Sequence, residues 1–298
     1  MALYKWIQWL YFHGLGGSAT MEYSIDIGGT NIKYGLCDES GNIQQKGEYP
    51  TLDTVDKIVQ SICDLPFEYT GIAISMPGIV NEDHSKAFIT GKLSFLSNYP
   101  LKKRLEEIKG CKVTIENDGR CATWAELGYG NLINSKNALV VVLGTYIGMG
   151  IVIDHKVYEG SHLLAGEYSD AHMDTEKTFK NTMAAYFGKD GLERATGLTG
   201  KELFDHLDDQ KVHEGLNQYC QNLAWMLSNI QLLLDVDTIL IGGGISAQPR
   251  LIECIKESMN NVKLWFCTLK MPEIQACKFN NDANLLGALY YYNNTENH

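Results

Sequence analysis

The amino-acid sequence predicts an α/β protein with two lobes. Stretches that resemble buried strands alternate along the chain with stretches of helical spacing, which is the pattern of α/β folds. At 298 residues the chain is longer than one domain usually needs. A hairpin pattern also occurs twice, so that Gly29 and Thr30 correspond to Gly144 and Thr145 later in the chain. Two hairpins that each begin an α/β half indicate a duplicated architecture.

The first half is predicted to open with a β-meander. Residues 22 to 27 have the pattern of a strand, the glycines at 28 and 29 supply a tight turn, and residues 31 to 38 form the returning strand. The later elements follow from buried apolar runs, helical spacing and terminal glycines. They are a strand at 43–50, a helix at 54–65, a strand at 71–76, a helix at 101–110, a strand at 112–117 and a helix at 119–130.

The second half begins with the repeated hairpin, over residues 138 to 154. A long helix follows, with one apolar stripe over residues 216 to 233 that is typical of core packing. Residues 238 to 244 predict a strand that ends in three glycines. The last helix, over residues 282 to 294, has Asp282 as its expected N-cap and is expected to cross back to the first lobe.

We expect a small lobe of residues 21 to 121 plus 283 to 298, and a large lobe of residues 122 to 282. Residues 1 to 20 are expected to be an extension outside the fold, because the first convincing strand begins just after them. Their aromatic-rich run is interrupted by polar residues and is shorter than the roughly 18 apolar residues that a membrane span needs. No membrane association is therefore expected.

The composition argues against several classes of protein. Lys and Arg number 25 against 36 Asp and Glu, and the resulting net charge of −11 repels phosphate backbones, so nucleic-acid binding is not expected. The eight cysteines are scattered and form no C-x-x-C pair. We interpret them as buried thiols of a protein in a reducing cytoplasm.

Three glycine turns at strand ends are candidate phosphate sites: Gly28 with Gly29, Gly144, and the run from Gly242 to Gly244. In the structural interpretation, the first pair only supplies positive φ to a hairpin. In the functional interpretation, all three turns present backbone N–H groups to a polyphosphate. None of them matches the dinucleotide or P-loop motifs, so a nucleotide would be bound by another geometry.

A further candidate is the junction where the strand at 112–117 delivers Asn117 and Asp118 to the start of a helix. Asp118 would cap that helix in the structural interpretation. In the functional interpretation it is a general base that meets a substrate hydroxyl in a cleft between the lobes. The two roles are compatible.

Three more carboxylates, Glu167, Asp170 and Asp174, lie in a glycine-bearing loop. Carboxylates of this kind bind polyols, but their spacing alone favours a solvated surface.

The combined motifs resemble those of the ROK family, which contains repressors, open reading frames and kinases. The matching segments occur in the family's order and are DIGGTNIKYGL, SMPGIVN, ENDGRCATWAELGYGN, VVVLGTYIGMGIVID, GEYSD and ILIGGGIS. The resemblance implies the actin-like, hexokinase-type, ribonuclease H-like two-lobed ATPase fold. No helix-turn-helix segment precedes residue 21, which separates the sequence from the family's repressors and favours an enzyme.

The sequence departs from the family pattern in two respects. Members usually carry a cysteine cluster that binds structural zinc, whereas no cysteine occurs here between Cys121 and Cys220, so structural zinc is not expected. Two helices are predicted in its place, over residues 175 to 212. The family's substrate-binding histidine corresponds to Asp170. These features are similar to those of a zinc-less branch that includes β-glucoside kinases and glucokinases.

The resemblance implies a role for each candidate residue. Asp118 would be the general base, and Asp26 would hold Mg²⁺ directly or through water. The residues implied for the sugar are Asn117, Asp118, Glu167, Asp170, Gly91 and Asn98. The residues implied for ATP are Asp26, Gly28, Gly29, Thr30, Asn31, Lys33, Gly144, Thr145, Gly242, Gly243 and Gly244.

The implied function is transfer of the γ-phosphoryl group of ATP to a sugar hydroxyl, with the 6-hydroxyl of glucose or of a β-glucoside such as cellobiose as the leading acceptor. One alternative is a kinase for an amino sugar such as N-acetylmannosamine. The other is a catalytically silent sugar sensor, against which the presence of Asp118 argues. The resemblance also implies a cytoplasmic homodimer.

Overall fold

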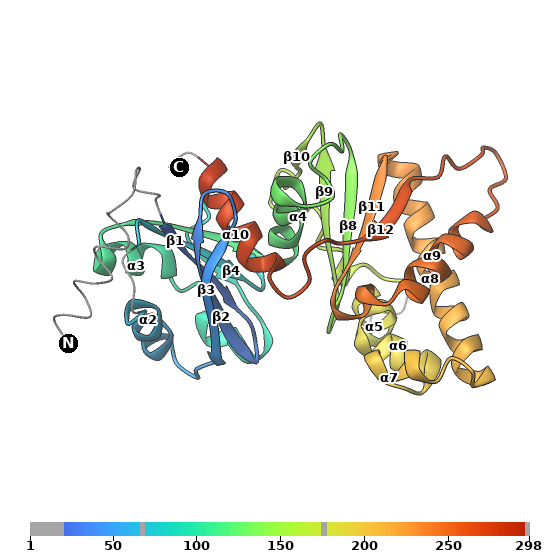
Figure 1. Cartoon of the computed structure of the whole chain (residues 1–298), viewed down its shortest axis with the longest axis horizontal. Helices are drawn as coiled ribbons and strands as arrows, with labels where there is room; N and C mark the ends of the chain where they lie inside the picture. The colour runs from blue at the N-terminus through green and yellow to red at the C-terminus, as the bar shows by residue number, and fades with distance from the viewer. Residues whose placement is uncertain (1–20, 66–68, 174–177, 296–298) are drawn as a thin grey trace.

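The computed structural model describes residues 21–65, 69–173 and 178–295, which form two large β-sheets with helices between and beside them (Figure 1). The extension predicted at residues 1–20 lies outside the described residues, as do Asp174 and the last three residues of the predicted small lobe. The prediction of an α/β protein is confirmed.

The first sheet has the strand order β3-β2-β1-β4-β7. Its strands are β1 (Met21–Ile27), β2 (Asn31–Asp38), β3 (Ile43–Pro50), β4 (Gly71–Met76) and β7 (Lys112–Asn117). β1 runs antiparallel to β2 and parallel to β4, which places Asp26 opposite both Lys33 and Ser75. Every residue of β1 is buried, as expected for a central strand that is covered on both faces. Asp26 is thereby fixed at the end of a rigid strand.

The second sheet has the order β10-β9-β8-β11-β12. Its strands are β8 (Ala138–Leu143), β9 (Ile147–Ile153), β10 (Lys156–Val157), β11 (Thr238–Gly242) and β12 (Glu273–Ala276). β8 runs antiparallel to β9 and parallel to β11, which repeats the relation of β1 to β2 and β4. The turn at Gly144 therefore corresponds in its sheet to the turn at Gly28, and the predicted duplication of the hairpin is confirmed.

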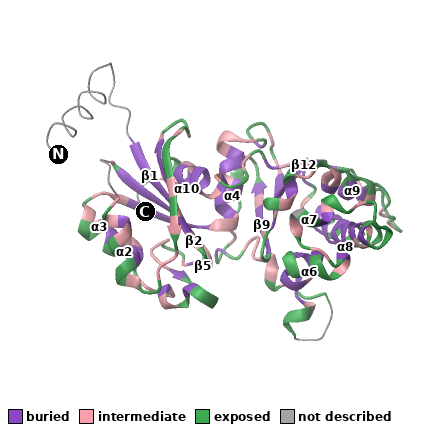
Figure 2. Ribbon diagram, turned by 60° about the horizontal axis from the view of Figure 1, so that its bottom comes forward, coloured by how far each residue is buried: buried purple, intermediate pink, exposed green. Residues whose placement is uncertain are grey.

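Each sheet has its own hydrophobic core, and buried residues concentrate in the sheets and on the inner faces of the helices (Figure 2). The first core is closed by α2 (Val55–Cys63) and α3 (Leu101–Lys109), which contribute Ile58 and Leu105 among others. Short elements lie between them, namely β5 (Ile79–Val80), β6 (Ala87–Phe88) and the 3₁₀ helix η1 (Gly91–Leu96). The second core is closed by α8 (Gln210–Leu234) and α9 (Pro249–Asn260), and η4 (Gly244–Ala247) follows β11.

Two helices lie between the sheets, α4 (Asp118–Tyr129) and α10 (Ala283–Asn294) (Figure 1). α10 packs on β1, β4 and β7 and so crosses back to the first sheet, as predicted, while α4 packs on β8 and β9. The helices touch through Gly287, where a Cβ would lie only 1.7 Å from the carbonyl oxygen of Cys121. The predicted boundary between residues 121 and 122 falls inside α4, and the division into lobes stays a prediction.

Asp282 is the N-cap residue of α10, as expected, but its side chain makes no capping hydrogen bond. Its carboxylate instead forms an ion pair with Lys46 on β3, with 2.8 Å between Nζ and Oδ2. A strand neighbour with a free ammonium group competes with the helix N–H groups for the same carboxylate, and the sequence alone does not show that this neighbour is present.

The prediction of two helices between residues 175 and 212 is also wrong. The described part of this segment contains η3 (Phe179–Asn181), α5 (Met183–Phe187), α6 (Lys189–Thr196), α7 (Gly200–Asp205) and the start of α8. Gly188 and Gly197 end two of the helices after only a few residues, so the helical spacing is too short to be recognised. Among the described residues, no helix is both long and apolar enough to cross a bilayer.

Candidate active site

Asp118 is the first residue of α4 and directly follows β7. The helix is capped by Asn117, whose Oδ1 accepts a hydrogen bond from the backbone N–H of Arg120 at 3.1 Å. The structural interpretation of Asp118 as the cap is therefore wrong. The Oδ1 of Asp118 accepts the N–H of its neighbour Gly119 at 2.9 Å. Because Asn117 caps the helix, the carboxyl group of Asp118 is available for another task.

The carboxyl group of Asp118 is a weaker acid than usual. Burial and the charges of Asp26 and Glu167 together raise its pKa to about 7, although the N–H of Gly119 acts in the opposite direction. β9 also reaches this point, since a Cβ on Gly119 would lie 3.7 Å from the backbone nitrogen of Met149. Asp118 thus lies where elements of both sheets meet. A carboxyl group that titrates near neutral pH suits a general base.

Asp26 is held by two side chains that the sequence analysis did not identify. Its Oδ1 accepts a hydrogen bond from the hydroxyl of Ser75 at 3.2 Å and another from the amide of Asn284 at 3.1 Å. Ser75 comes from β4 and Asn284 from α10. Burial raises the pKa of Asp26, and Asn284, the charge of Lys33 and Ser75 act in the opposite direction. These neighbours partly offset the cost of ionising a buried carboxyl group.

Glu167 lies just before the 3₁₀ helix η2 (Tyr168–Asp170) and is half-buried. Burial raises its pKa, the charge of Arg120 lowers it, and the charge of Asp170 raises it again. Asp170 itself is exposed. The structure therefore brings Glu167 close to Asp118 and leaves Asp170 at the surface beside it.

Gly91 is the first residue of η1 and Asn98 follows its C-cap, and both have positive φ, of 72° and 57°. The backbone N–H of Asn98 donates to the carbonyl of Ala87 at 2.8 Å. Asn is one of the few residues that adopt this conformation readily, which gives Asn98 a structural role. Within the described ranges, no hydrogen bond joins Gly91 or Asn98 to Asp118, and their contact with a sugar stays a prediction.

The turn at Gly28 and Gly29 differs from the structural interpretation, because neither glycine has positive φ. Gly28 is required by a close approach, since a Cβ there would lie 2.9 Å from the carbonyl oxygen of Asn31. Gly29 is different, because its Cβ would meet no atom within 4 Å. Gly29 is exposed, and no contact within the protein requires a glycine at this position. A glycine of this kind, three residues after Asp26, fits a backbone that a ligand approaches closely.

A pocket of about 340 Å³ joins two of the predicted glycine turns, because Gly144, Thr145 and Gly244 all line it. The other lining residues were not identified from the sequence, and they are Leu143, Phe187, Gly188, Lys189, Leu192, Thr199, Gly200, Tyr219 and Ile245. The backbone N–H of Lys189 donates to the carbonyl of Gly144 at 2.9 Å and ties α6 to the turn. Apolar and aromatic walls with a few polar groups are typical of a small-molecule site.

Gly242 and Gly243 are explained by packing. A Cβ on Gly242 would lie 3.0 Å from the sulfur of Cys277, and one on Gly243, whose φ is 93°, would lie 2.1 Å from the carbonyl oxygen of Leu143. Gly244 alone of the three has no atom within 4 Å of its Cβ position. Among Gly242, Gly243 and Gly244, only Gly244 lines the pocket with space that a ligand could occupy.

These residues fit ATP and Mg²⁺. The backbone is open at Gly29 and Gly244, where a side chain would fill space that a phosphate or nucleoside needs. The apolar walls of Phe187 and Tyr219 suit a planar base. The carboxylate of Asp26 is a hard oxygen donor of the kind that Mg²⁺ prefers.

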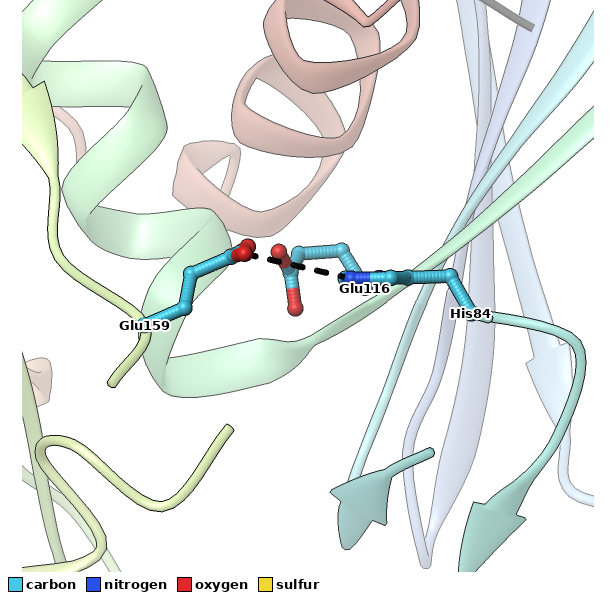
Figure 3. A group of neighbouring side chains, drawn as sticks. All are labelled: His84, Glu116 and Glu159. Atoms are coloured by element: carbon cyan, nitrogen blue, oxygen red, sulfur yellow. Dashed lines mark ion pairs between the residues drawn. The ribbon is translucent and has the colours of Figure 1, made fainter. Parts of the chain in front are cut away.

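Three side chains without an assigned role, His84, Glu116 and Glu159, meet beside this site (Figure 3). One potential ligand atom from each lies within 4.8 Å of the others, and Nε2 of His84 is 3.9 Å from Oε2 of Glu159. Glu116 is fully buried on β7 and forms an ion pair with Arg120, at 2.8 Å between Oε1 and Nε. No sequence pattern indicates this cluster, because its members come from three separate segments.

Comparison with known proteins identifies similar chains along nearly the whole length. The model of the ROK family matches residues 22–295. A β-glucoside kinase from Listeria innocua is 30% identical over 294 residues, which cover 92% of this chain and 98% of that protein. Both shares are high, so the similarity is not confined to one lobe.

Solved structures agree with this similarity. A ROK family protein from Streptococcus pneumoniae, in complex with sucrose, is 28% identical and superposes with a TM-score of 0.84, covering 92% of this chain and 98% of that one. A putative N-acetylmannosamine kinase from Listeria monocytogenes is also 28% identical, with a TM-score of 0.82 and shares of 92% and 98%. The predicted actin-like two-lobed fold is confirmed.

Proposed function

The chain belongs to the ROK family, and on this basis we propose that it is an ATP-dependent sugar kinase. The observation that carries the proposal is the position of Asp118. Its carboxyl group interacts with Asp26 of the small lobe and Glu167 of the large lobe, at the junction of the two sheets. A pocket that suits a nucleotide lies in the large lobe, lined by Gly144 and Gly244.

In the proposed reaction, Asp118 accepts the proton of the sugar hydroxyl. The hydroxyl oxygen forms a bond to the γ-phosphorus of ATP as the bond from that phosphorus to the β,γ-bridging oxygen breaks, which leaves a sugar phosphate and ADP. Phosphoryl transfer depends mainly on positioning and charge neutralisation. Glu167 and Asn117 orient the sugar, and closure of the lobes around the bound substrates would exclude water that otherwise takes the phosphoryl group.

Mg²⁺, when bound, neutralises charge on the phosphates of ATP. Asp26 is the residue that would hold it, directly or through water. Ser75 and Asn284 fix the orientation of the Asp26 carboxylate through their hydrogen bonds to Oδ1.

The proposed acceptor is the 6-hydroxyl of glucose or of a β-glucoside such as cellobiose. The similarity to a β-glucoside kinase over almost the whole of both chains supports this choice. N-acetylmannosamine is the second candidate, supported by similarity to a putative N-acetylmannosamine kinase. We also propose a cytoplasmic homodimer, and the eight free cysteines are consistent with a reducing compartment.

The test is ATP consumption by the purified chain with a panel of glucose, cellobiose, other β-glucosides and N-acetylmannosamine. Turnover with a glucoside supports the proposal, and turnover with N-acetylmannosamine alone supports the second candidate. Sugar binding in calorimetry without turnover of any member would identify a sensor and would overturn the kinase proposal.

A further inference from the structure

A buried guanidinium joins the junction at Asp118 to the loop that carries Glu167. Arg120 is only 1% exposed, and its Nε donates to the Oε1 of Glu116 at 2.8 Å. Its Nη1 donates to the backbone carbonyl of Leu163 at 2.9 Å. One side chain thus connects the end of β7 and the start of α4 with a segment from the other lobe. Because desolvation offsets the attraction between buried charges, this pair contributes more to geometry than to stability.

The segment held by Arg120 has an unusual backbone. Leu163 has a φ of 55°, in the left-handed region that a leucine rarely adopts. Gly166 has a φ of 89° and presses against β9, where a Cβ would lie 2.5 Å from the carbonyl oxygen of Met149. Glu167 follows directly. Its position is therefore set by several anchors, among them the contact of Gly166 with β9, the hydrogen bond from Ser169 Oγ to the carbonyl of Ile147, and the hydrogen bond from Arg120 to Leu163.

We propose that Arg120 is a positioning residue of the active site: through Glu116 and the carbonyl of Leu163 it holds the loop that places Glu167 beside Asp118. This inference rests on the proposed kinase function, because it assigns Glu167 to the sugar. Arg120 touches no reacting atom. It acts on the sugar only through the loop, so its replacement affects sugar binding more than ATP binding.

The cluster in Figure 3 also has the composition of a divalent-cation site, but its contacts favour the ion pair. Both oxygens of Glu116 already accept hydrogen bonds, Oε1 from Arg120 and Oε2 from the indole of Trp124 at 3.4 Å. A guanidinium in contact with the same carboxylate repels a second cation. His84, whose pKa is lowered by burial, and the partly exposed Glu159 complete the cluster, with 3.9 Å between Nε2 and Oε2.

The test uses Arg120→Lys, which keeps the charge but lacks the planar fork that reaches two acceptors. Because loss of one buried partner is destabilising, the double variant Glu116→Gln with Arg120→Met removes both charges together. Arg250→Lys is the matched control, since Arg250 pairs with Glu257 at the surface of α9. Amide hydrogen exchange over residues 158–167 is measured in the ligand-free full chain, together with KM for the best sugar and for ATP.

We expect Arg120→Lys and the double variant to speed exchange in this segment about tenfold and to raise the sugar KM by about tenfold, with the ATP KM within about twofold of its original value. Arg250→Lys should change neither. Unchanged exchange over residues 158–167 in a folded Arg120→Lys protein would overturn the proposal. So would calorimetric binding of one equivalent of Zn²⁺ that His84→Ala abolishes, because the cluster would then be a metal site. The exchange readout needs no turnover, so a failed kinase assay leaves this test intact.

Discussion

Asp26 is the last residue but one of the central strand of the first sheet, and its charge raises the pKa of Asp118, which begins the helix α4 between the sheets. The effect adds to burial and brings the pKa of Asp118 to about 7. Two carboxyl groups with different neighbours can divide the work, one remaining ionised beside a cation and the other exchanging a proton near neutral pH.

The pH dependence of catalysis follows from this pair. The base must be ionised, so kcat/KM for the sugar should rise with pH and level off above about pH 7, the titration point of Asp118. Asp26→Asn removes the repulsion and should move the midpoint to lower pH, although the rate also falls. Initial rates in a series of constant-ionic-strength buffers measure both profiles. A rate that does not change across the neutral range would exclude Asp118 as the base.

Removal of the base should separate binding from chemistry. We expect Asp118→Asn to lower kcat by about 10²–10⁴-fold, because the hydroxyl loses its proton acceptor while the side-chain shape is kept. Sugar affinity from calorimetry should persist. Asp154→Asn, at an exposed turn after β9, is the matched control and should retain full activity. A near-normal kcat in Asp118→Asn would remove this residue from the mechanism.

The glycine at the turn after β8 is open to a ligand. A Cβ at Gly144 would meet no protein atom closer than 3.6 Å, and its φ is not positive, so Gly144→Val should fold normally. We expect the KM for ATP to rise about tenfold or more, since the side chain enters the space proposed for phosphate. The sugar KM and the melting temperature are internal controls. ATP affinity equal to that of the original protein would contradict the nucleotide assignment of this turn.

Glu159 should make stability depend on pH. Burial and the charge of Glu116 together raise its pKa to about 7, although the charge of Arg120 acts in the opposite direction. The folded protein thus holds this proton more tightly than the unfolded chain does. Its stabilising contribution is complete below about pH 4.5 and is lost as pH rises through about 7.

The glutamine of Glu159→Gln does not titrate, so the free energy of unfolding of this variant relative to the original protein should increase with pH. We expect a change of about 1–2 kcal/mol between about pH 5 and pH 8, reduced by the partial exposure of the side chain. Denaturant unfolding at both pH values measures it, with the exposed Glu82→Gln as control. An equal difference at both pH values would show that Glu159 titrates normally.

The contact between α4 and α10 leaves no room for a side chain. Because a Cβ on Gly287 would lie 1.7 Å from the carbonyl oxygen of Cys121, Gly287→Ala should destabilise the protein by about 1–3 kcal/mol despite the better helix propensity of alanine. Gly200→Ala is the matched control, since its Cβ would meet its first neighbour at 3.7 Å. Thermal unfolding compares them. Equal melting temperatures for Gly287→Ala and Gly200→Ala would mean that α4 and α10 can move apart without loss of stability.

The elements that the sequence predicted well have local signals. The hairpins that begin with β1 and β8 are predicted by strand patterns that end at glycines, and α8 is predicted by its apolar stripe. Asp118 was identifiable because it follows a buried strand within the segment ENDGRCATWAELGYGN, which resembles a motif of the family.

The missed residues depend on contacts between segments far apart in the chain. Asn284 reaches Asp26 across 258 positions, and Lys46 takes the carboxylate of Asp282 across 236. Arg120 appears as an ordinary helix residue until its partner Glu116 and the carbonyl of Leu163 are placed in space. The positive φ expected at Gly28 and Gly29 was wrong: a close backbone approach demands glycine at Gly28 without it, and Gly29 has open space around its Cβ position.

The helix that covers β1, β4 and β7 is encoded long after those strands. During synthesis the first sheet therefore leaves the ribosome with an apolar face uncovered, and that face stays bare until Leu285, Leu286 and Leu289 emerge. An apolar surface that is exposed during synthesis is prone to aggregation until the helix that covers it has formed.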